Sequence, residues 1–399
     1  MSESGHQPTT ASAEPGSATP DAPNALTAPN APSGTPGTQA PTDLASWTRR
    51  VRGSRRRRRI TAVTGAVAGL LTLTAVALPS PYIIESPGPT FNTIGEMDGE
   101  PVISINGAET YPTDGNLDLT TVYVSGAPTG WTTFLDVVRS WAQPAEAVIP
   151  QELVYPSGTT SDEVTAQNTE AMATSQSWAV AAALENLGID YRQTLFVAGF
   201  TGESQATGLL EPKDQLVSAD GVEVTGLEGL KGRLNASGGE TVELGIVRDG
   251  EELEVEVPVY PGAEGEWLMG VYLDSDFEFP LDVTVTLENV GGPSAGMMFA
   301  LGIIDELTPG PMAGGRHIAG TGTIDPDGTV GEIGGIVQKV SGAADSGAEV
   351  FLAPEGNCAE LAGRIPDGIA VYSVATLDQA RSVVEAVGSG GMPQVPACG

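Results

Sequence analysis

The residues best suited to chemistry are a serine in a tight glycine-proline turn and one downstream lysine. Residues 291–296 read Gly-Gly-Pro-Ser-Ala-Gly, and Lys339 is the only lysine in the C-terminal third of the chain. A serine hydroxyl becomes a good nucleophile when a neighbouring base takes its proton. Histidine, the usual base, is present only as His6 and His317. The pattern therefore indicates a hydrolase in which Ser294 is the nucleophile and Lys339 the base.

The turn has two local interpretations. Apolar residues follow it at helical spacing, so Ser294 is expected at the start of a helix. A serine there is often an N-cap. The free backbone N–H groups of such a turn can equally hold a developing oxyanion, which would give Gly292 and Ala295 that role. The turn alone leaves both interpretations open.

The segment after the turn favours the catalytic interpretation of the turn over the N-cap interpretation. Residues 318–340 predict a strand, a hairpin at Asp327-Gly328, a second strand, the pair Gly334-Gly335 and then a helix that carries Lys339. Residues 349–354 predict the next strand.

A lysine can act as a base only in its neutral form. The neighbours Ile336, Val337 and Val340 are apolar, so we expect burial and the absence of a paired carboxylate to lower the pKa of Lys339. A solvated helix lysine is the alternative. His317 is the rival base, although no carboxylate at a recognisable spacing orients it.

Residues 283–355 together resemble the proteolytic domain of the Lon-type Ser-Lys peptidases. The resemblance implies that Ser294, in Pro-Ser-Ala-Gly, is the nucleophile and that Lys339, four residues after Gly-Gly, is the base. It also implies that Thr321, in the Thr-Gly of the preceding strand, hydrogen-bonds the lysine. The family's acidic residue three positions before the serine is Gly291 here. The chain has no Gly-x-x-x-x-Gly-Lys-Ser/Thr motif, so ATP-driven unfolding is not expected.

The stretch from 193 to 262 has a different texture of short strands and turns. It resembles a bacterial PDZ domain through its Gly-Leu, x-Pro-x-Asp and x-x-x-Gly-x-x-Val pattern and the short helix after them. The resemblance implies a peptide partner, and a β-rich spacer is the alternative. A long helix at about 162–187 precedes it. If that helix belongs to the peptidase, residues of about 100–190 and 265–388 form one domain around an inserted PDZ-like unit.

The N-terminal part predicts a membrane anchor. Residues 1 to about 48 are too poor in large apolar side chains to fold, so they are expected to be disordered. Eight arginines between 49 and 59 are followed by 19 uncharged residues, Ile60–Leu78, which is about the length that spans a bilayer. The positive-inside rule then places the N-terminus in the cytoplasm and everything after Pro79 outside. A nucleic-acid-binding patch and a signal peptide cleaved after Ala75-Val76-Ala77 are the alternatives.

The rest of the chain is strongly acidic. Eight of the 18 basic residues lie between 49 and 59, which leaves 10, whereas only four of the 51 acidic residues precede residue 60, which leaves 47. This balance disfavours nucleic acid and anionic lipid as partners of that part. The two cysteines, Cys358 and Cys398, predict one disulfide if this end is outside the cytosol, and two free thiols if it is not.

These observations predict an α+β protein: a Lon-type peptidase domain with a PDZ-like β-rich domain, preceded by one transmembrane helix and a disordered N-terminal tail. The expected segments are a disordered tail with an arginine-rich stop (1–59), the transmembrane helix (60–80), the N-terminal part of the peptidase region (85–192), the PDZ-like domain (193–262), the Lon-like proteolytic domain (265–388) and a tail (389–399).

The predicted function is that of an ATP-independent serine endopeptidase, held in the cell membrane by a single span, that cleaves extracytoplasmic polypeptides. No cofactor, metal or nucleic acid is expected, and the resemblance implies a homo-hexamer. The alternatives are a catalytically silent peptide-binding scaffold and a site-specific protease that cuts a membrane-bound signalling partner.

Overall fold

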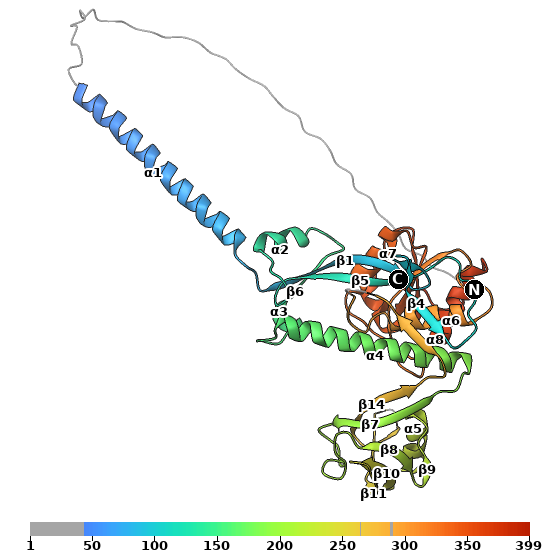
Figure 1. The fold of residues 1–399 in the computed structure, drawn as a ribbon. Helices are drawn as coiled ribbons and strands as arrows, with labels where there is room; N and C mark the ends of the chain where they lie inside the picture. The colour runs from blue at the N-terminus through green and yellow to red at the C-terminus, as the bar shows by residue number, and fades with distance from the viewer. Residues whose placement is uncertain (1–43, 264, 288–289) are drawn as a thin grey trace, which may run out of the picture. The chain divides into compact units, whose positions relative to one another are not determined.

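The computed structural model describes residues 44–263, 265–287 and 290–399, with side chains from residue 56 onward. Its first element is the helix α1, Leu44–Ala77 (Figure 1). The helix includes residues 44–48, the last part of the tail that was expected to be disordered, and the arginine-rich stop that follows it. Arginine is a good helix former, which lets the arginine block continue the apolar helix. Residues 1–43 of the predicted tail lie outside the described residues.

Part of α1 has the composition of a membrane span. Its segment Arg56–Ala77 is 22 residues long with a mean hydropathy of 1.9, and no residue of its most apolar stretch is buried in the protein. A helix of about 20 apolar residues is long enough to cross the hydrocarbon layer. Among the described residues this is the one helix that is long and apolar enough to do so.

The residues that follow build one mixed sheet of six strands. Its strands, in spatial order, are β20 (Ala370–Val374), β19 (Val350–Pro354), β16 (His317–Gly320), β5 (Asn116–Ser125), β1 (Tyr82–Asn92) and β6 (Ala147–Pro150). Strands β5, β16, β19 and β20 are parallel, whereas β1 runs antiparallel to both β5 and β6. The sheet therefore combines segments that are about 170 residues apart in the chain (Figure 1).

Helices cover both faces of this sheet. The helix α7 (Ile336–Ser346) packs on one face with Ala319 and Phe351. On the other face α4 (Ser161–Leu187), α6 (Gly296–Leu307) and α8 (Leu377–Gly388) pack with Leu117 and Ile318. Successive strand residues point to opposite faces, so Ile318 and Ala319 lie in different cores.

The long helix α4 has clear start and stop signals. Thr160 and Glu163 form a reciprocal capping box at its N-terminus, and Gly188 ends it in the left-handed conformation with φ of 67°. The helix predicted for about 162–187 is confirmed.

A second sheet forms the β-rich part. Its strands, in order, are β11 (Glu251–Val257), β10 (Val242–Arg248), β8 (Gln215–Ala219), β7 (Arg192–Phe200) and β14 (Val271–Glu278), and β9 (Val222–Glu223) pairs with β8. The helix α5 (Leu227–Ala236) packs on it, and the two form a hydrophobic core of their own. A tight hairpin at Asp249-Gly250 joins β10 to β11. Because β14 pairs with β7, this sheet extends beyond residue 262, the expected end of the PDZ-like domain.

The remaining elements are short. They are β2 (Glu96–Met97), β3 (Glu100–Pro101), β4 (Ile103–Asn106), α2 (Phe134–Ser140), α3 (Gln151–Val154), β12 (Tyr260–Pro261), β13 (Trp267–Leu268), β15 (Asp282–Val285), β17 (Thr323–Ile324), β18 (Val330–Gly331) and the 3-10 helix η1 (Glu355–Leu361). The strand β15, which precedes the serine turn in the chain, pairs with β4 outside the main sheet.

A disulfide joins Cys358 to Cys398 and holds the C-terminal segment against the sheet. The backbone N–H of Cys398 donates to Val371 O at 3.0 Å, and that of Ser373 donates to Pro396 O at 2.8 Å. The segment therefore lies along the outer strand β20.

We expect replacement of both cysteines by serine to destabilise the protein. The disulfide closes a loop with a sequence separation of 40 residues. Restricting an unfolded loop of this size contributes about 2–4 kcal/mol to the free energy of unfolding. Urea unfolding of the full chain should show a lower midpoint for the double variant, with Met392→Ala at an exposed position as the control. An unchanged midpoint would mean that the disulfide does not stabilise this fold.

Candidate active site

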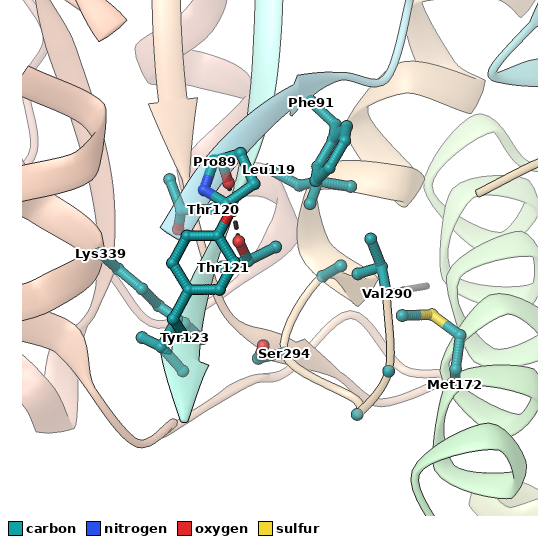
Figure 2. Close-up of a pocket in the computed structure, with 14 residues that line it drawn as sticks. Pro89, Phe91, Leu119, Thr120, Thr121, Tyr123, Met172, Val290, Ser294 and Lys339 are labelled. Carbon is teal, nitrogen blue, oxygen red and sulfur yellow. Dashed lines mark hydrogen bonds between the residues drawn. The ribbon is translucent and has the colours of Figure 1, made fainter. Parts of the chain in front are cut away.

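Ser294 lies in the turn immediately before α6, and its hydroxyl does not cap that helix. The N-cap residue is Ala295, and no side-chain hydrogen bond caps the helix start. Ser294 lines a pocket instead (Figure 2). The geometry therefore speaks against the interpretation of Ser294 as a structural N-cap.

Hydrogen bonds to two successive carbonyls fix the turn. Ser294 O accepts from Thr321 Oγ1 and from the backbone N–H of Gly322, each at 2.9 Å. Pro293 O accepts from the hydroxyl of Ser175 on α4 at 3.0 Å. A Cβ atom on Gly296 would lie 2.7 Å from a methyl carbon of Ile324, so only glycine allows this close approach. The serine is thus held between α4 and the segment that follows β16.

The two residues predicted to bind an oxyanion differ in what their N–H groups do. The N–H of Gly292 donates to Asn168 O at 3.1 Å, and Gly292 adopts φ of 90°. Within the described part of the chain, the N–H of Ala295 has no acceptor. Gly292 therefore shapes the turn, and Ala295 keeps a donor available beside Ser294.

Lys339 is buried on α7 and points toward the serine turn. Its side chain is only 3% exposed, and Nζ donates to Thr321 Oγ1 at 3.1 Å. Because the Thr321 hydroxyl gives its own proton to Ser294 O, it can only accept from the lysine. The burial is incompatible with a solvated surface lysine.

The surroundings of Lys339 lower the pKa of its amine. Burial disfavours the charged form and lowers this pKa to about 8, while the negative charge of Glu85 acts in the opposite direction. Glu85 acts on Lys339 without forming an ion pair with it, because strand β1 places Glu85 next to the start of α7. Burial in turn raises the pKa of Glu85. No ion pair within 4.0 Å joins the two groups in the described structure.

Ser294 and Lys339 open into the same pocket of about 400 Å³ (Figure 2). Residues 119–123 of β5 form one wall, and Met172 and Val290 lie on the side of α4. The pocket can admit a few side chains of a polypeptide beside the serine hydroxyl. Within the described residues, no group of three or more His, Cys, Asp or Glu side chains could hold a metal ion.

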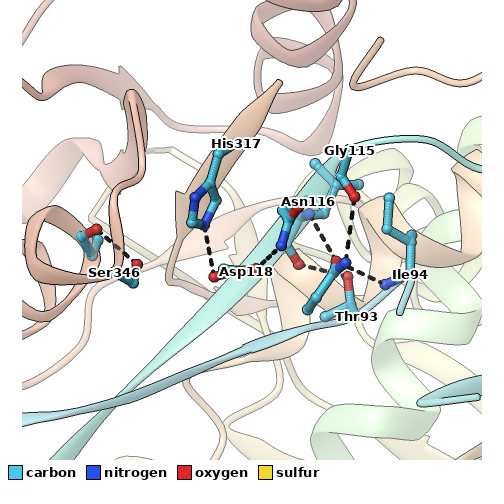
Figure 3. A network of polar contacts seen from close by, with 10 residues as sticks. Thr93, Ile94, Gly115, Asn116, Asp118, His317 and Ser346 are labelled. Carbon is cyan, nitrogen blue, oxygen red and sulfur yellow. Dashed lines mark hydrogen bonds and ion pairs between the residues drawn. The ribbon is translucent and has the colours of Figure 1, made fainter. Parts of the chain in front are cut away.

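His317 has a carboxylate partner that the sequence did not indicate. Its Nε2 lies 2.8 Å from Asp118 Oδ2, and Asn116 donates to the other Asp118 oxygen at 3.4 Å (Figure 3). The expectation that no carboxylate orients His317 is wrong, because the parallel pairing of β5 and β16 brings together residues that are 199 positions apart. Neither residue lines the pocket of Ser294, so the pair joins two strands of the sheet.

Three residues of this site were missed in the sequence. Ser175 and Asn168 on α4 hold the serine turn, and Glu85 acts on Lys339. Glu85 is the only charged residue between Pro79 and Asn92, and an isolated charge in a strand-like segment was the available signal. The two polar residues of α4 carry no such signal.

Comparison with known proteins assigns the C-terminal region. Residues 288–386 match the family model of the Lon protease (S16) C-terminal proteolytic domain. The chain is 39% identical over 92 residues to Lon protease 1 of Sorangium cellulosum, which covers 22% of this chain and 11% of that protein. It is 34% identical over 90 residues to Lon protease 2 of Bacillus subtilis, which covers 23% of this chain and 16% of that protein.

The chain thus spans less than a fifth of the length of these relatives. A solved PDZ domain of the SdrC-like protein from Listeria monocytogenes is 15% identical and covers 20% of this chain and 85% of its own, with a TM-score of 0.19. The PDZ-like assignment stays a proposal. Residues 288–386 are thus similar to the Lon protease (S16) C-terminal proteolytic domain, and this similarity indicates a serine-type peptidase.

Proposed function

We propose that this protein is an endopeptidase with a Ser-Lys dyad, Ser294 and Lys339, which acts without ATP. The observation that carries the proposal is the buried Lys339. Its amine donates to the Thr321 hydroxyl, which in turn donates to Ser294 O, and Lys339 and Ser294 line the same pocket. Because its pKa is lowered, a larger fraction of this buried amine is neutral near pH 7, and the neutral amine is the form that can accept a proton.

In the proposed reaction, neutral Lys339 takes the proton of the Ser294 hydroxyl as its oxygen attacks the peptide carbonyl carbon. The N–H of Ala295 donates to the oxyanion that forms. The lysine ammonium then gives its proton to the leaving amine, which leaves an ester on Ser294. Water attacks this ester as its proton passes to Lys339, and the lysine ammonium then gives that proton to the Ser294 oxygen as the acid product departs. Thr321 keeps the amine oriented throughout.

We further propose that α1 anchors the protein in the cell membrane, with its N-terminus in the cytoplasm and the peptidase outside. The block of arginines directly before the apolar segment supports this orientation. The disulfide between Cys358 and Cys398 fits an oxidising compartment. The substrates would then be extracytoplasmic polypeptides.

The β-rich part is proposed to recruit these substrates as a PDZ-like domain. Its strand β14 is an edge strand, which leaves one row of backbone groups open to an added strand. Leu195, Leu227 and Leu273 line a cavity beside it, which lies between β7, α5 and β14 on one side and the end of α4 and residues 325–329 on the other. A peptide added along β14 could place apolar side chains there. If no peptide binds, the β-rich part is a spacer.

Two other functions use the same features. A catalytically silent scaffold would bind peptides at β14, and a site-specific protease would cut a membrane-bound signalling partner. The buried, low-pKa lysine favours an active enzyme, because a scaffold has no need of it. Assembly as a homo-hexamer is proposed from the family resemblance.

We expect Ser294→Ala and Lys339→Ala each to abolish peptide cleavage in the absence of ATP. Removing a nucleophile or its base typically lowers kcat by about 10⁴-fold or more. Casein or fluorogenic-peptide hydrolysis by the full chain in detergent measures the effect, with the exposed Ser389→Ala as the matched control. Equal activity in all four proteins would exclude this dyad, and no activity in any of them would favour the scaffold.

The rate should rise with pH in the range set by Lys339. With a pKa of about 8, the neutral amine is the minor form at pH 7 and the major form at pH 9. The expected increase in kcat/KM between these two pH values is about tenfold. A pH profile of peptide hydrolysis measures it, and a profile that is flat or falls over this range would contradict a lysine base.

Glu85→Gln should shift this profile to lower pH. The carboxylate stabilises the charged form of Lys339, so its removal lowers the pKa of the lysine below about 8. The ratio of activity at pH 7 to activity at pH 9 should therefore increase. Glu100→Gln, at an exposed position, is the matched control. An unchanged midpoint in Glu85→Gln would show that Glu85 does not act on the lysine.

A further inference from the structure

Two short helices, α2 and α3, carry large apolar side chains that face solvent. Trp131 is 71% exposed, Leu135 59%, Val138 60% and Trp141 70%. On α3, Leu153 is also strongly exposed. We call these five residues the apolar rim. Exposed apolar side chains of this size, on a chain whose domains are strongly acidic, favour contact with a partner that is itself apolar.

The face of α2 that bears these residues is distinct from the face that builds the fold. Val137 and Ser140 are buried against the protein, whereas the polar residues Asp136 and Arg139 lie on a third side. At 100° per residue, Leu135, Val138 and Trp141 share the remaining side. The exposure of Leu135, Val138 and Trp141 therefore follows from the orientation of α2.

Hydrogen bonds tie both helices to the residues that directly follow α1. Thr133, the N-cap of α2, pairs with Pro79, and the N–H of Ser80 donates to Thr132 O at 2.8 Å. The N–H of Gln151, the first residue of α3, donates to Pro81 O at 3.0 Å. Both helices thus lie at the end of β1 that follows α1 in the chain (Figure 1).

This attachment limits how far the apolar rim can be from the end of the apolar helix. Pro79 is two residues after Ala77, the last residue of α1, and α2 is seven residues long. Its axis is therefore about 10 Å long, at 1.5 Å per residue. The medium that surrounds the C-terminal end of α1 is therefore close enough for Trp131, Leu135 and Trp141 to contact it.

We propose that the apolar rim inserts into the outer interface of the membrane that α1 spans. This proposal rests on the proposed anchoring by α1. Tryptophan is enriched at the level of the lipid headgroups, and amphipathic helices bury their apolar faces there. Because the domains are acidic, the contact depends on apolar burial and not on anionic lipid. Insertion adds a second attachment that fixes the peptidase against the membrane surface.

The test uses the full chain in phosphatidylcholine vesicles with brominated acyl chains, which quench nearby tryptophan fluorescence. The double variant Trp131→Phe/Trp141→Phe should lose the larger part of the quenchable emission. Trp267→Phe, a tryptophan of the β-rich part, is the matched control and should leave that quenching unchanged. Adding phosphatidylglycerol to the vesicles should not increase the quenching.

Two further measurements keep the proposal separate from the proposed function. Resistance to alkaline carbonate extraction reports whether α1 is inserted, and peptide hydrolysis reports whether the dyad works. If α1 is inserted and the double variant is quenched as strongly as the wild type, the apolar rim does not contact lipid and the proposal is wrong. If the protein is extracted by carbonate, the anchoring and the proposal fail together, while the peptidase assignment stands.

A second variant tests the most direct rival, contact between copies of this chain. Val138→Gln keeps the helix surface but weakens apolar burial, and it should reduce the quenching of Trp131 and Trp141. If it leaves the quenching unchanged and converts an oligomer to a smaller species in analytical ultracentrifugation, the apolar rim is a subunit interface instead.

Discussion

The hydroxyl of Thr321 is the point on which the candidate site depends. It accepts from Lys339 and donates to the carbonyl of Ser294, so one side chain fixes both the amine and the turn. An amine buried without a hydrogen-bond partner would be costly, and this one has a partner that carries no charge. The parallel sheet brings this about, because β16 delivers Thr321 between the helix that carries the lysine and the turn that carries the serine.

Electrostatics at the site is a balance between two opposing effects. Burial lowers the pKa of Lys339 to about 8, and the charge of Glu85 moderates the decrease. The same burial raises the pKa of Glu85, which weakens its influence as the pH falls. A lysine that is neither fully charged nor fully neutral near physiological pH can both take and return a proton.

Much of this arrangement could be predicted from local sequence signals. The helix α4 has its start and stop encoded by Thr160, Glu163 and Gly188, and the segment of the candidate site has Thr321 and Lys339 at the spacing that the family resemblance implies. Glu85 and the pair of His317 and Asp118 could not be predicted in the same way. Their contacts depend on which strands become neighbours, and that pairing joins positions about 200 residues apart. The start of α1 was missed because arginine-rich segments are compatible with both a helix and a disordered tail.

The short connection between α1 and β1 has a consequence for which substrates can be cut. Glu85 is eight positions after Ala77, and an extended chain covers at most about 3.5 Å per residue, or about 28 Å. If α1 spans the bilayer, the enzyme samples only a thin layer of space above it. Under the proposed function, a polypeptide that emerges from the membrane, or is tethered to it, would spend more of its time in this layer than one that diffuses freely.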